Sequence, residues 1–257
     1  MIFGFEPGIF IFLLVAGFIG GIWNSIAGAA TLFTFPVLIM AGLPPVVANA
    51  TNFLALLPAN AAALPAYVKE LKEVGRNAIL SMILASGLGA ILGSYLLIYT
   101  GEALFVFVVP YLILAATLLF AFGDQIRNFM LNGRFSALAS GTIGPLILMG
   151  LFSIYGGYFG AGLGIILLAI VQIMGYSNFL IANSLKNLLA TTFTIISIVI
   201  FGVNGLIHWP AAIIMMTAST CGGYLGGRLS KYVNAQYLRI FVITFGLGLS
   251  FYYIFFK

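Results

Sequence analysis

Long apolar runs recur along the whole chain, and they restrict its fold more than any other feature. A helix needs about 20 mostly apolar residues to span about 30 Å of hydrocarbon. These runs are too long and too uniformly apolar for the alternating strands of an outer-membrane barrel. The sequence therefore predicts an all-α integral membrane protein. Its helical elements are expected at 8–24, 28–42, 44–67, 77–98, 103–123, 136–157, 161–176, 178–202, 207–227 and 235–256.

The scarcity of charge agrees with this fold class. Charged residues make up 6% of the chain and hydrophobic residues 63%, against about 25% charged residues in an ordinary soluble domain. The mean hydropathy is +1.20. We expect a multi-pass protein of the plasma or inner membrane, surrounded by the lipid bilayer and without a nucleic-acid partner.

Two of the apolar elements are short and bounded by glycines, at 28–42 and 161–176. Such segments are typical of half-helices or re-entrant segments, because irregular backbone at membrane depth must be buried in protein or line a cavity. We therefore expect broken helices at both places.

The second half of the chain resembles the first. The segment Ala48–Ala55 resembles Ala182–Ala190, with one extra residue in the second copy. Weaker matches pair Gly28 with Gly162, Gly42 with Gly175, Ala85-Ser86 with Ala218-Ser219, Gly89 with Gly222, Gly93 with Gly226 and Tyr99 with Tyr232. The sequence predicts a first transmembrane repeat at 1–123, a cytoplasmic linker at 124–135 and a second repeat at 136–257.

The positive charges predict how the two copies are oriented. Cytoplasmic loops are enriched in Lys and Arg, and eight of the ten basic residues fall on one side if the loop at 69–76 is inside. The loops equivalent to 69–76 and 228–239 then lie on opposite faces, so the repeats are inverted. Inverted repeats with broken helices are typical of secondary transporters, which bind substrate near the midplane. The expected fold is a polytopic helical bundle of two inverted-topology repeats.

Lys186 is the only charged residue deep inside an apolar run. A charge at that depth costs about 2.5–3.5 kcal/mol on insertion scales and is usually functional. All five acids, Glu6, Glu70, Glu73, Glu102 and Asp124, lie near expected ends or loops. An unpaired cation favours an anionic ligand, although Lys186 could also be purely structural, paired with backbone carbonyls at a helix break.

Polar residues accompany this lysine in both copies. In the second copy they recur at helical spacing, at Asn183, Asn187, Thr191 and Thr194. In the first copy the corresponding residues are uncharged, at Asn49, Thr51 and Asn52. We expect the amides and Thr51 to donate hydrogen bonds to the anion that Lys186 neutralises.

Glycine-rich segments precede both short elements. If each opens a half-helix, free N–H groups and the positive dipole end point toward the substrate; the alternative is that the glycines only allow close helix packing. On the first interpretation the substrate-binding residues also include Asn24, Ser25, Gly28, Gly160 and Gly162.

Several motifs of membrane enzymes and pumps do not occur in this sequence. It has no His-Glu-x-x-His, no Gly-x-Ser-x-Gly and no Walker loop. One histidine and one cysteine provide neither a metal-ligand pattern nor an intrachain disulfide. We therefore expect no enzymatic activity, no catalytic residues, no cofactor and no metal.

At these same residues the sequence resembles the TauE/SafE sulfite exporter family. The first half matches at Gly20-Gly21, Asn24-Ser25, Gly28, Pro36-Val37-Leu38, Gly42-Leu43-Pro44 and Ala48–Asn52, and the second at Gly156–Gly164 and Ala182–Lys186. Where the family usually carries consecutive glycines, this chain has Gly28-Ala29-Ala30. The resemblance implies a small permease for sulfite, sulfonates or related organosulfur anions.

The expected function is export of such an anion by alternating access. Two other functions fit the same pattern. One is a non-transporting membrane scaffold or assembly partner, in which Lys186 only stabilises a helix break. The other is an anion channel, which would conduct without saturation or exchange.

Overall fold

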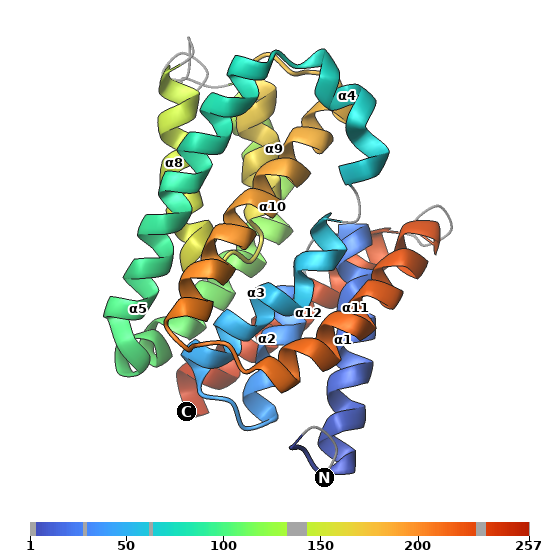
Figure 1. Cartoon of the computed structure of the whole chain (residues 1–257), viewed down its shortest axis with the longest axis vertical. Helices are drawn as coiled ribbons and strands as arrows, with labels where there is room; N and C mark the ends of the chain where they lie inside the picture. The colour runs from blue at the N-terminus through green and yellow to red at the C-terminus, as the bar shows by residue number, and fades with distance from the viewer. Residues whose placement is uncertain (1–3, 28–29, 62–63, 133–142, 230–234, 257) are drawn as a thin grey trace.

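The computed structural model describes residues 4–27, 30–61, 64–132, 143–229 and 235–256, and these contain helices and no strand. Figure 1 shows a bundle of long and short helices. The helices are α1 (Pro7–Ala27), α2 (Thr31–Met40), α3 (Pro45–Ala61), the 3₁₀ helix η1 (Leu64–Tyr67), α4 (Val68–Glu73), α5 (Arg76–Ala121), α6 (Gly123–Asn132), α8 (Ile143–Tyr158), α9 (Leu163–Ile173), α10 (Phe179–Val203), α11 (Trp209–Leu229) and α12 (Ala235–Phe256).

Membrane-spanning length is present in this part of the chain. Three of the described helices, α1, α5 and α10, are long and apolar enough to cross a bilayer by length and composition. Many large apolar side chains on the outer faces of the helices are exposed, including Leu88 and Leu92 of α5. Apolar side chains on the outside and inside of one bundle are expected when the solvent is lipid. The protein is an all-α membrane protein.

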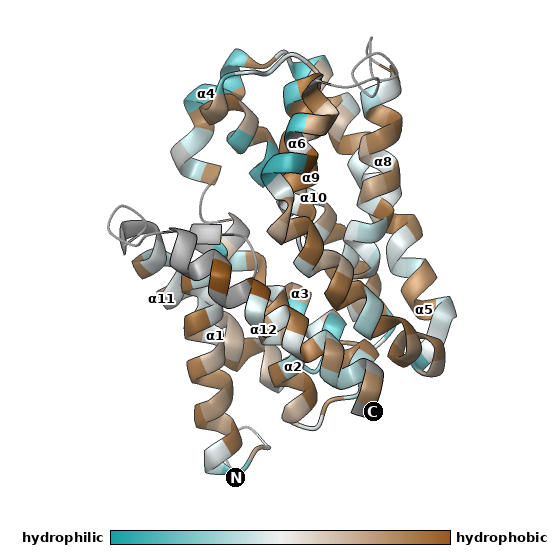
Figure 2. Ribbon diagram, turned by 180° about the vertical axis from the view of Figure 1, so that it is seen from behind, coloured by the Kyte–Doolittle hydropathy of each residue, from teal (hydrophilic) through white to brown (hydrophobic). Residues whose placement is uncertain are grey.

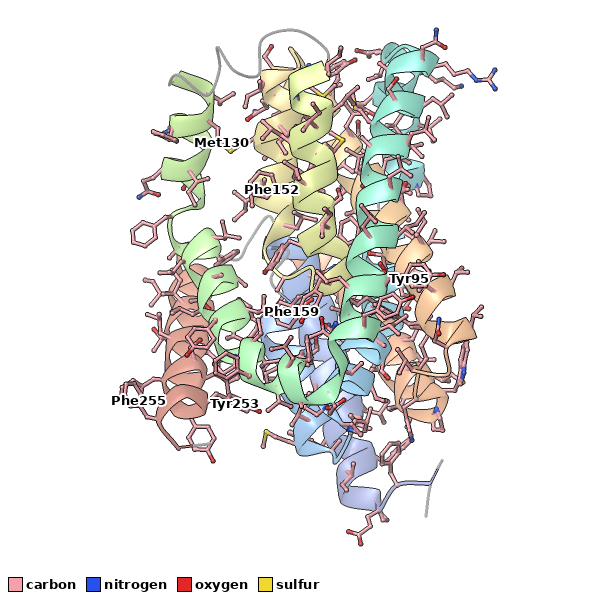
Figure 3. All side chains as sticks on the ribbon, turned by 90° about the vertical axis from the view of Figure 1, so that its left-hand side faces the viewer. Tyr95, Met130, Phe152, Phe159, Tyr253 and Phe255 are labelled. Carbon is pink, nitrogen blue, oxygen red and sulfur yellow. The ribbon has the colours of Figure 1, made fainter. Side chains whose placement is uncertain are left out.

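The long helix α5 is two helical segments joined at Gly101. This residue has φ +67° and ψ 179°, which glycine adopts far more readily than residues with a Cβ. Figure 3 shows the ribbon of α5 turning back on itself between two helical segments. The two segments correspond to the elements expected at 77–98 and 103–123.

The element expected at 44–67 is divided in the structure. Helix α3 ends at Ala61, and the separate helices η1 and α4 follow. Pro65 lies inside η1 and has no N–H to donate to a preceding turn, which disfavours a continuous α-helix across 44–67. A second difference lies after α5, where the amphipathic helix α6 (Gly123–Asn132) includes residues 124–132 of the linker expected at 124–135.

Two pairs of helices pack closely through glycines. In the pair α1 and α11, a Cβ added to Gly21 would lie 2.2 Å from the carbonyl oxygen of Ser219. In the pair α5 and α8, a Cβ on Gly93 would lie 2.0 Å from the carbonyl oxygen of Ile154. Small residues let membrane helices approach this closely.

The short helices α2 and α9 lie where broken helices are expected. They contain 10 and 11 residues, which corresponds to about 15 and 16 Å at 1.5 Å per residue, half the hydrocarbon thickness. Gly42 and Gly175 end them at φ +93° and +98°. The same two N–H to carbonyl hydrogen bonds close each turn: Gly42 to Ile39 (2.9 Å), Leu43 to Leu38 (3.2 Å), Gly175 to Gln172 (3.0 Å) and Tyr176 to Val171 (3.3 Å).

The polar residues gather at one end of the bundle. Figure 2 shows hydrophilic colours on α4 and α6 at the upper end, while most of the remaining ribbon is hydrophobic. Helix α4 carries Lys69 and Lys72, and α6 includes position Arg127. Two of the segments that the charge pattern assigns to one side of the membrane therefore lie at the same end of the molecule.

Candidate functional site

Lys186 lies in the first half of α10. The side chain of Asn178 begins this helix by accepting a hydrogen bond from the N–H of Leu180, at 2.9 Å. Lys186 follows Phe179 by seven residues, or about 10 Å along the axis. Its neighbour Leu185 and the next-turn residue Leu189 are fully buried. Lys186 itself is half-buried, next to these fully buried residues.

The Lys186 side chain reaches the first turn of α9. Its Cδ lies 3.6 Å from the position that a Cβ on Gly164 would occupy, and Gly164 is the second residue of α9. Among the described residues, the ammonium makes no hydrogen bond and no ion pair. A cation held at this depth without a protein counter-charge favours an anionic ligand.

The start of α9 adds a second source of positive potential. Gly162 precedes the helix in the left-handed conformation, with φ +75°, and no side chain caps it. The first N–H groups of a helix have no partner within the helix, and the positive end of its dipole lies there. The Lys186 stem and the α9 N-terminus thus lie together, which is an arrangement suited to an oxyanion.

Tyr155 and Asn49 each donate a side-chain hydrogen bond to a backbone carbonyl at the break between α8 and α9. The Tyr155 hydroxyl donates to the carbonyl oxygen of Ala161 at 2.7 Å. Asn49 of α3 donates from Nδ2 to the carbonyl oxygen of Tyr158 at 2.9 Å. The Oδ1 atom of Asn49 is buried and has no hydrogen-bond partner in the described part of the chain. The predicted site residue Asn49 is therefore placed at the break.

Aromatic rings surround the same break. Gly160 has φ +78°, and a Cβ there would lie 3.4 Å from Phe53 of α3 and 3.8 Å from Phe193 of α10. Phe159 lies near the centre of the molecule (Figure 3). Its ring packs edge-on against that of Phe35, with 5.4 Å between the ring centroids. Helices α2, α3 and α10 thus all contribute side chains around the α8–α9 break.

The other two predicted residues of α3 hold neighbouring segments. The Thr51 hydroxyl accepts from the N–H of His208, at 3.0 Å, just before α11 begins. Asn52 accepts from the hydroxyl of Thr34 at 2.6 Å, and its Nδ2 donates to Thr31 at 3.3 Å. Both side chains are buried, and their polar groups are engaged within the protein in this conformation.

On α10 the polar residues differ in their partners. Asn183 donates from Nδ2 to the hydroxyl of Tyr67, at 2.9 Å. Asn187 makes no hydrogen bond within the described part of the chain. The Thr191 hydroxyl is buried and also has no partner, whereas that of Thr192 donates to a backbone carbonyl at 2.9 Å.

The structure relates Lys186 to one residue of the first half. Asn52 contacts Thr31 at the start of α2, and Lys186 contacts Gly164 at the start of α9. Lys186 follows Asn52 by 134 positions and Gly164 follows Thr31 by 133. The correspondence of Asn52 with Lys186 within two repeats stays a prediction.

The remaining predicted residues lie near the end of α1. Asn24 is half-buried in its last turns. Gly28 and the side chain of Ser25 lie outside the described residues. Sequence reasoning missed Tyr67, Tyr155 and Glu70. The Oε2 atom of Glu70 is buried and has no hydrogen-bond partner among the described residues. Tyr67 and Glu70 lie in a polar connection, and no motif indicates that this connection packs against α10.

Comparison with known proteins identifies a family. The chain is 30% identical over 232 residues to a protein of Haemophilus influenzae named "Probable membrane transporter protein", covering 90% of this chain and 89% of the relative. It is 27% identical over 248 residues to "Probable membrane transporter protein YfcA" of Escherichia coli K12, covering 94% and 87%. No solved structure matches the chain. The family model "Sulfite exporter TauE/SafE" matches residues 13–253, so this membrane transporter belongs to the TauE/SafE sulfite exporter family.

Proposed function

We propose that this transporter exports sulfite, a sulfonate or a related small organosulfur anion across the plasma membrane by alternating access. One observation carries the proposal. The Lys186 side chain reaches the first turn of α9 with its Cδ atom, and its ammonium has no counter-charge among the described residues. The family description supports the sulfur oxyanion as the substrate class.

Each part of the site has a distinct role in this proposal. Lys186 neutralises the anion, and the first N–H groups of α9 and the Asn187 amide donate hydrogen bonds to it. Gly160 and Gly162 supply the backbone turn that exposes the α9 N-terminus. Asn49 holds the break. The prediction that Asn183, Thr51, Asn52, Asn24, Ser25 and Gly28 contact substrate stays a prediction.

Two observations support alternating access between two inverted copies, at 1–123 and 136–257. The turns after α2 and α9 carry the same pair of hydrogen bonds. In Figure 1, α1 begins near the N-terminus at the lower end of the view, while α8 begins at the upper end. Opposite directions of equivalent helices are expected for inverted repeats, and transporters of this type rock one repeat against the other.

Export of an anion needs no coupling ion in this proposal. Each negative charge that leaves a cell with a negative interior gains about 2.3 kcal/mol per 100 mV. None of the acidic residues pairs with Lys186 in the described part of the chain. The membrane potential alone can therefore drive the substrate outward.

The test is electrogenic sulfite flux into proteoliposomes without a proton or sodium gradient. We expect saturable flux with the wild type and with Lys72→Ala, which removes an exposed lysine of α4, and no flux with Lys186→Ala. A strict requirement for an ion gradient would contradict uncoupled export. Flux without saturation or exchange would indicate a channel, and no flux from any variant would favour a scaffold.

A further inference from the structure

The orientation of the Asn49 carboxamide is determined by its surroundings. The partner of its nitrogen is a backbone carbonyl, that of Tyr158 at 2.9 Å. A carbonyl oxygen only accepts hydrogen bonds, so the NH₂ group must lie on that side. The Oδ1 atom is therefore the free half of the amide, and exchanging the two atoms would leave two acceptors facing each other.

This free oxygen is an unpaired acceptor in the protein interior. Asn49 is 0% exposed, and among the residues that the structure describes Oδ1 has no hydrogen-bond partner. Most buried polar atoms in proteins are paired, so an exception calls for an explanation. An acceptor of this kind is satisfied by a ligand that brings an N–H or O–H group.

The Asn49 side chain lies at the α8–α9 break, where the anion would bind. Asn49 is anchored on the last residue of α8, four positions before Gly162, the N-cap of α9. One turn further along α3, Phe53 contacts the position of Gly160 in the same break. The Lys186 side chain extends from α10 to the first turn of α9. The break thus combines the donors of Lys186 and of the α9 N-terminus with the Asn49 carboxamide.

We infer that the substrate carries a hydrogen-bond donor in addition to its anionic group. This inference rests on the proposed function. The oxyanion accepts from Lys186 and from the α9 N–H groups, while Asn49 Oδ1 accepts from an O–H or N–H of the same molecule. Hydrogensulfite and hydroxy- or amino-substituted sulfonates have this chemistry. A fully deprotonated or purely alkyl anion lacks the donor and leaves Oδ1 unpaired.

The inference also states when the contact forms. Because Asn49 is fully buried in this conformation, a ligand reaches its oxygen only after the helices around the break separate. Alternating access requires such a movement. The donor-bearing substrate is then recognised when the site is open and held when it closes.

The test compares two sulfonates of similar size as inhibitors of sulfite flux in proteoliposomes. Hydroxyethanesulfonate carries a terminal hydroxyl, and propanesulfonate carries a methyl group in its place. We expect the wild type to be inhibited about tenfold more strongly by the hydroxyl compound, the factor typical of one buried hydrogen bond made or left unmade. Asn49→Leu should lose this preference. The matched control Tyr155→Phe removes the other side-chain hydrogen bond described at the break. It should keep the preference for the hydroxyl compound.

The outcomes separate this inference from the proposed function. Equal inhibition of the wild type by both sulfonates overturns the inference and leaves anion transport standing. A preference that survives in Asn49→Leu overturns the role of Asn49. Should Asn49→Leu fail to fold, two measurements on the wild type decide. One is the comparison of the two sulfonates, and the other compares inhibition by hydrogensulfite with inhibition by an alkyl sulfonate. No sulfite flux in the wild type contradicts the proposed function itself.

Discussion

Replacing Lys186 by methionine separates a functional lysine from a structural one. Methionine keeps an unbranched side chain that can pack on Gly164 of α9, but it removes the charge. If the ammonium interacts only with the substrate, its burial destabilises the ligand-free protein, because no protein group neutralises the charge. Lys186→Met should then unfold at a higher temperature than the wild type, because removing an unpaired buried charge is favourable.

The expected size of this effect follows from the burial of the side chain. A lysine at the centre of a membrane helix costs about 2.5–3.5 kcal/mol. Because Lys186 is partly exposed, we expect Lys186→Met to raise the free energy of unfolding by about 1–3 kcal/mol. For a protein of this size, each kcal/mol raises the unfolding temperature by about 2–4 °C. Lys72→Met on the exposed face of α4 should change stability by less than about 0.5 kcal/mol.

The same assay with sulfite reports binding. At a concentration 100 times its dissociation constant, a ligand stabilises the wild type by about 2.7 kcal/mol. Loss of a charge-assisted hydrogen bond weakens binding by about 10- to 150-fold. At a 100-fold weakening, the stabilisation of Lys186→Met falls to about 0.4 kcal/mol. A variant that unfolds at a much lower temperature, or that keeps the full sulfite shift, would refute this reasoning.

Three further substitutions test other parts of the account. Thr191→Val should be neutral or stabilising by up to about 1 kcal/mol, because it removes a buried hydroxyl that has no partner among the described residues. Thr192→Val removes a hydroxyl that donates a hydrogen bond, so this variant should unfold at a lower temperature than Thr191→Val. The reverse order of unfolding temperatures would contradict these hydrogen-bond assignments. Gly93→Ala should lower stability by about 1–3 kcal/mol through overpacking, whereas Gly248→Ala, where a Cβ meets nothing within 4 Å, should not. Tyr67→Phe should increase hydrogen exchange in η1 and α4, because it removes the acceptor of the α10 amide; unchanged exchange would show that this bond does not hold the segment.

Much of the helical architecture could be predicted because the membrane imposes length and hydropathy on each helix. The short elements at 28–42 and 161–176 contain α2 and α9, each ending at a glycine with positive φ. The division of 44–67 into α3, η1 and α4 was not predicted. Its residues are mostly apolar. Pro65 disfavours one continuous helix, but the packing of η1 and α4 against α10 is a long-range contact that no local pattern indicates.

The candidate site was predictable as a set of residues but not as a set of contacts. Lys186 could be identified because a charge in an apolar run is rare. The partners of the amides could not, since Asn49 and Tyr158 are 109 positions apart in the sequence and Asn183 and Tyr67 are 116 apart. Which half of an amide is left free depends on such long-range contacts, and that half determines whether the residue offers a donor or an acceptor.

The central claim is that an anion binds between Lys186 and the start of α9. The most direct measurement is a structure of the protein with selenite, a heavier analogue of sulfite that is located by its anomalous signal. The account predicts selenium density within hydrogen-bonding reach of the Lys186 ammonium and the first N–H groups of α9. Selenium bound elsewhere, with Lys186 paired to a protein group, would contradict it.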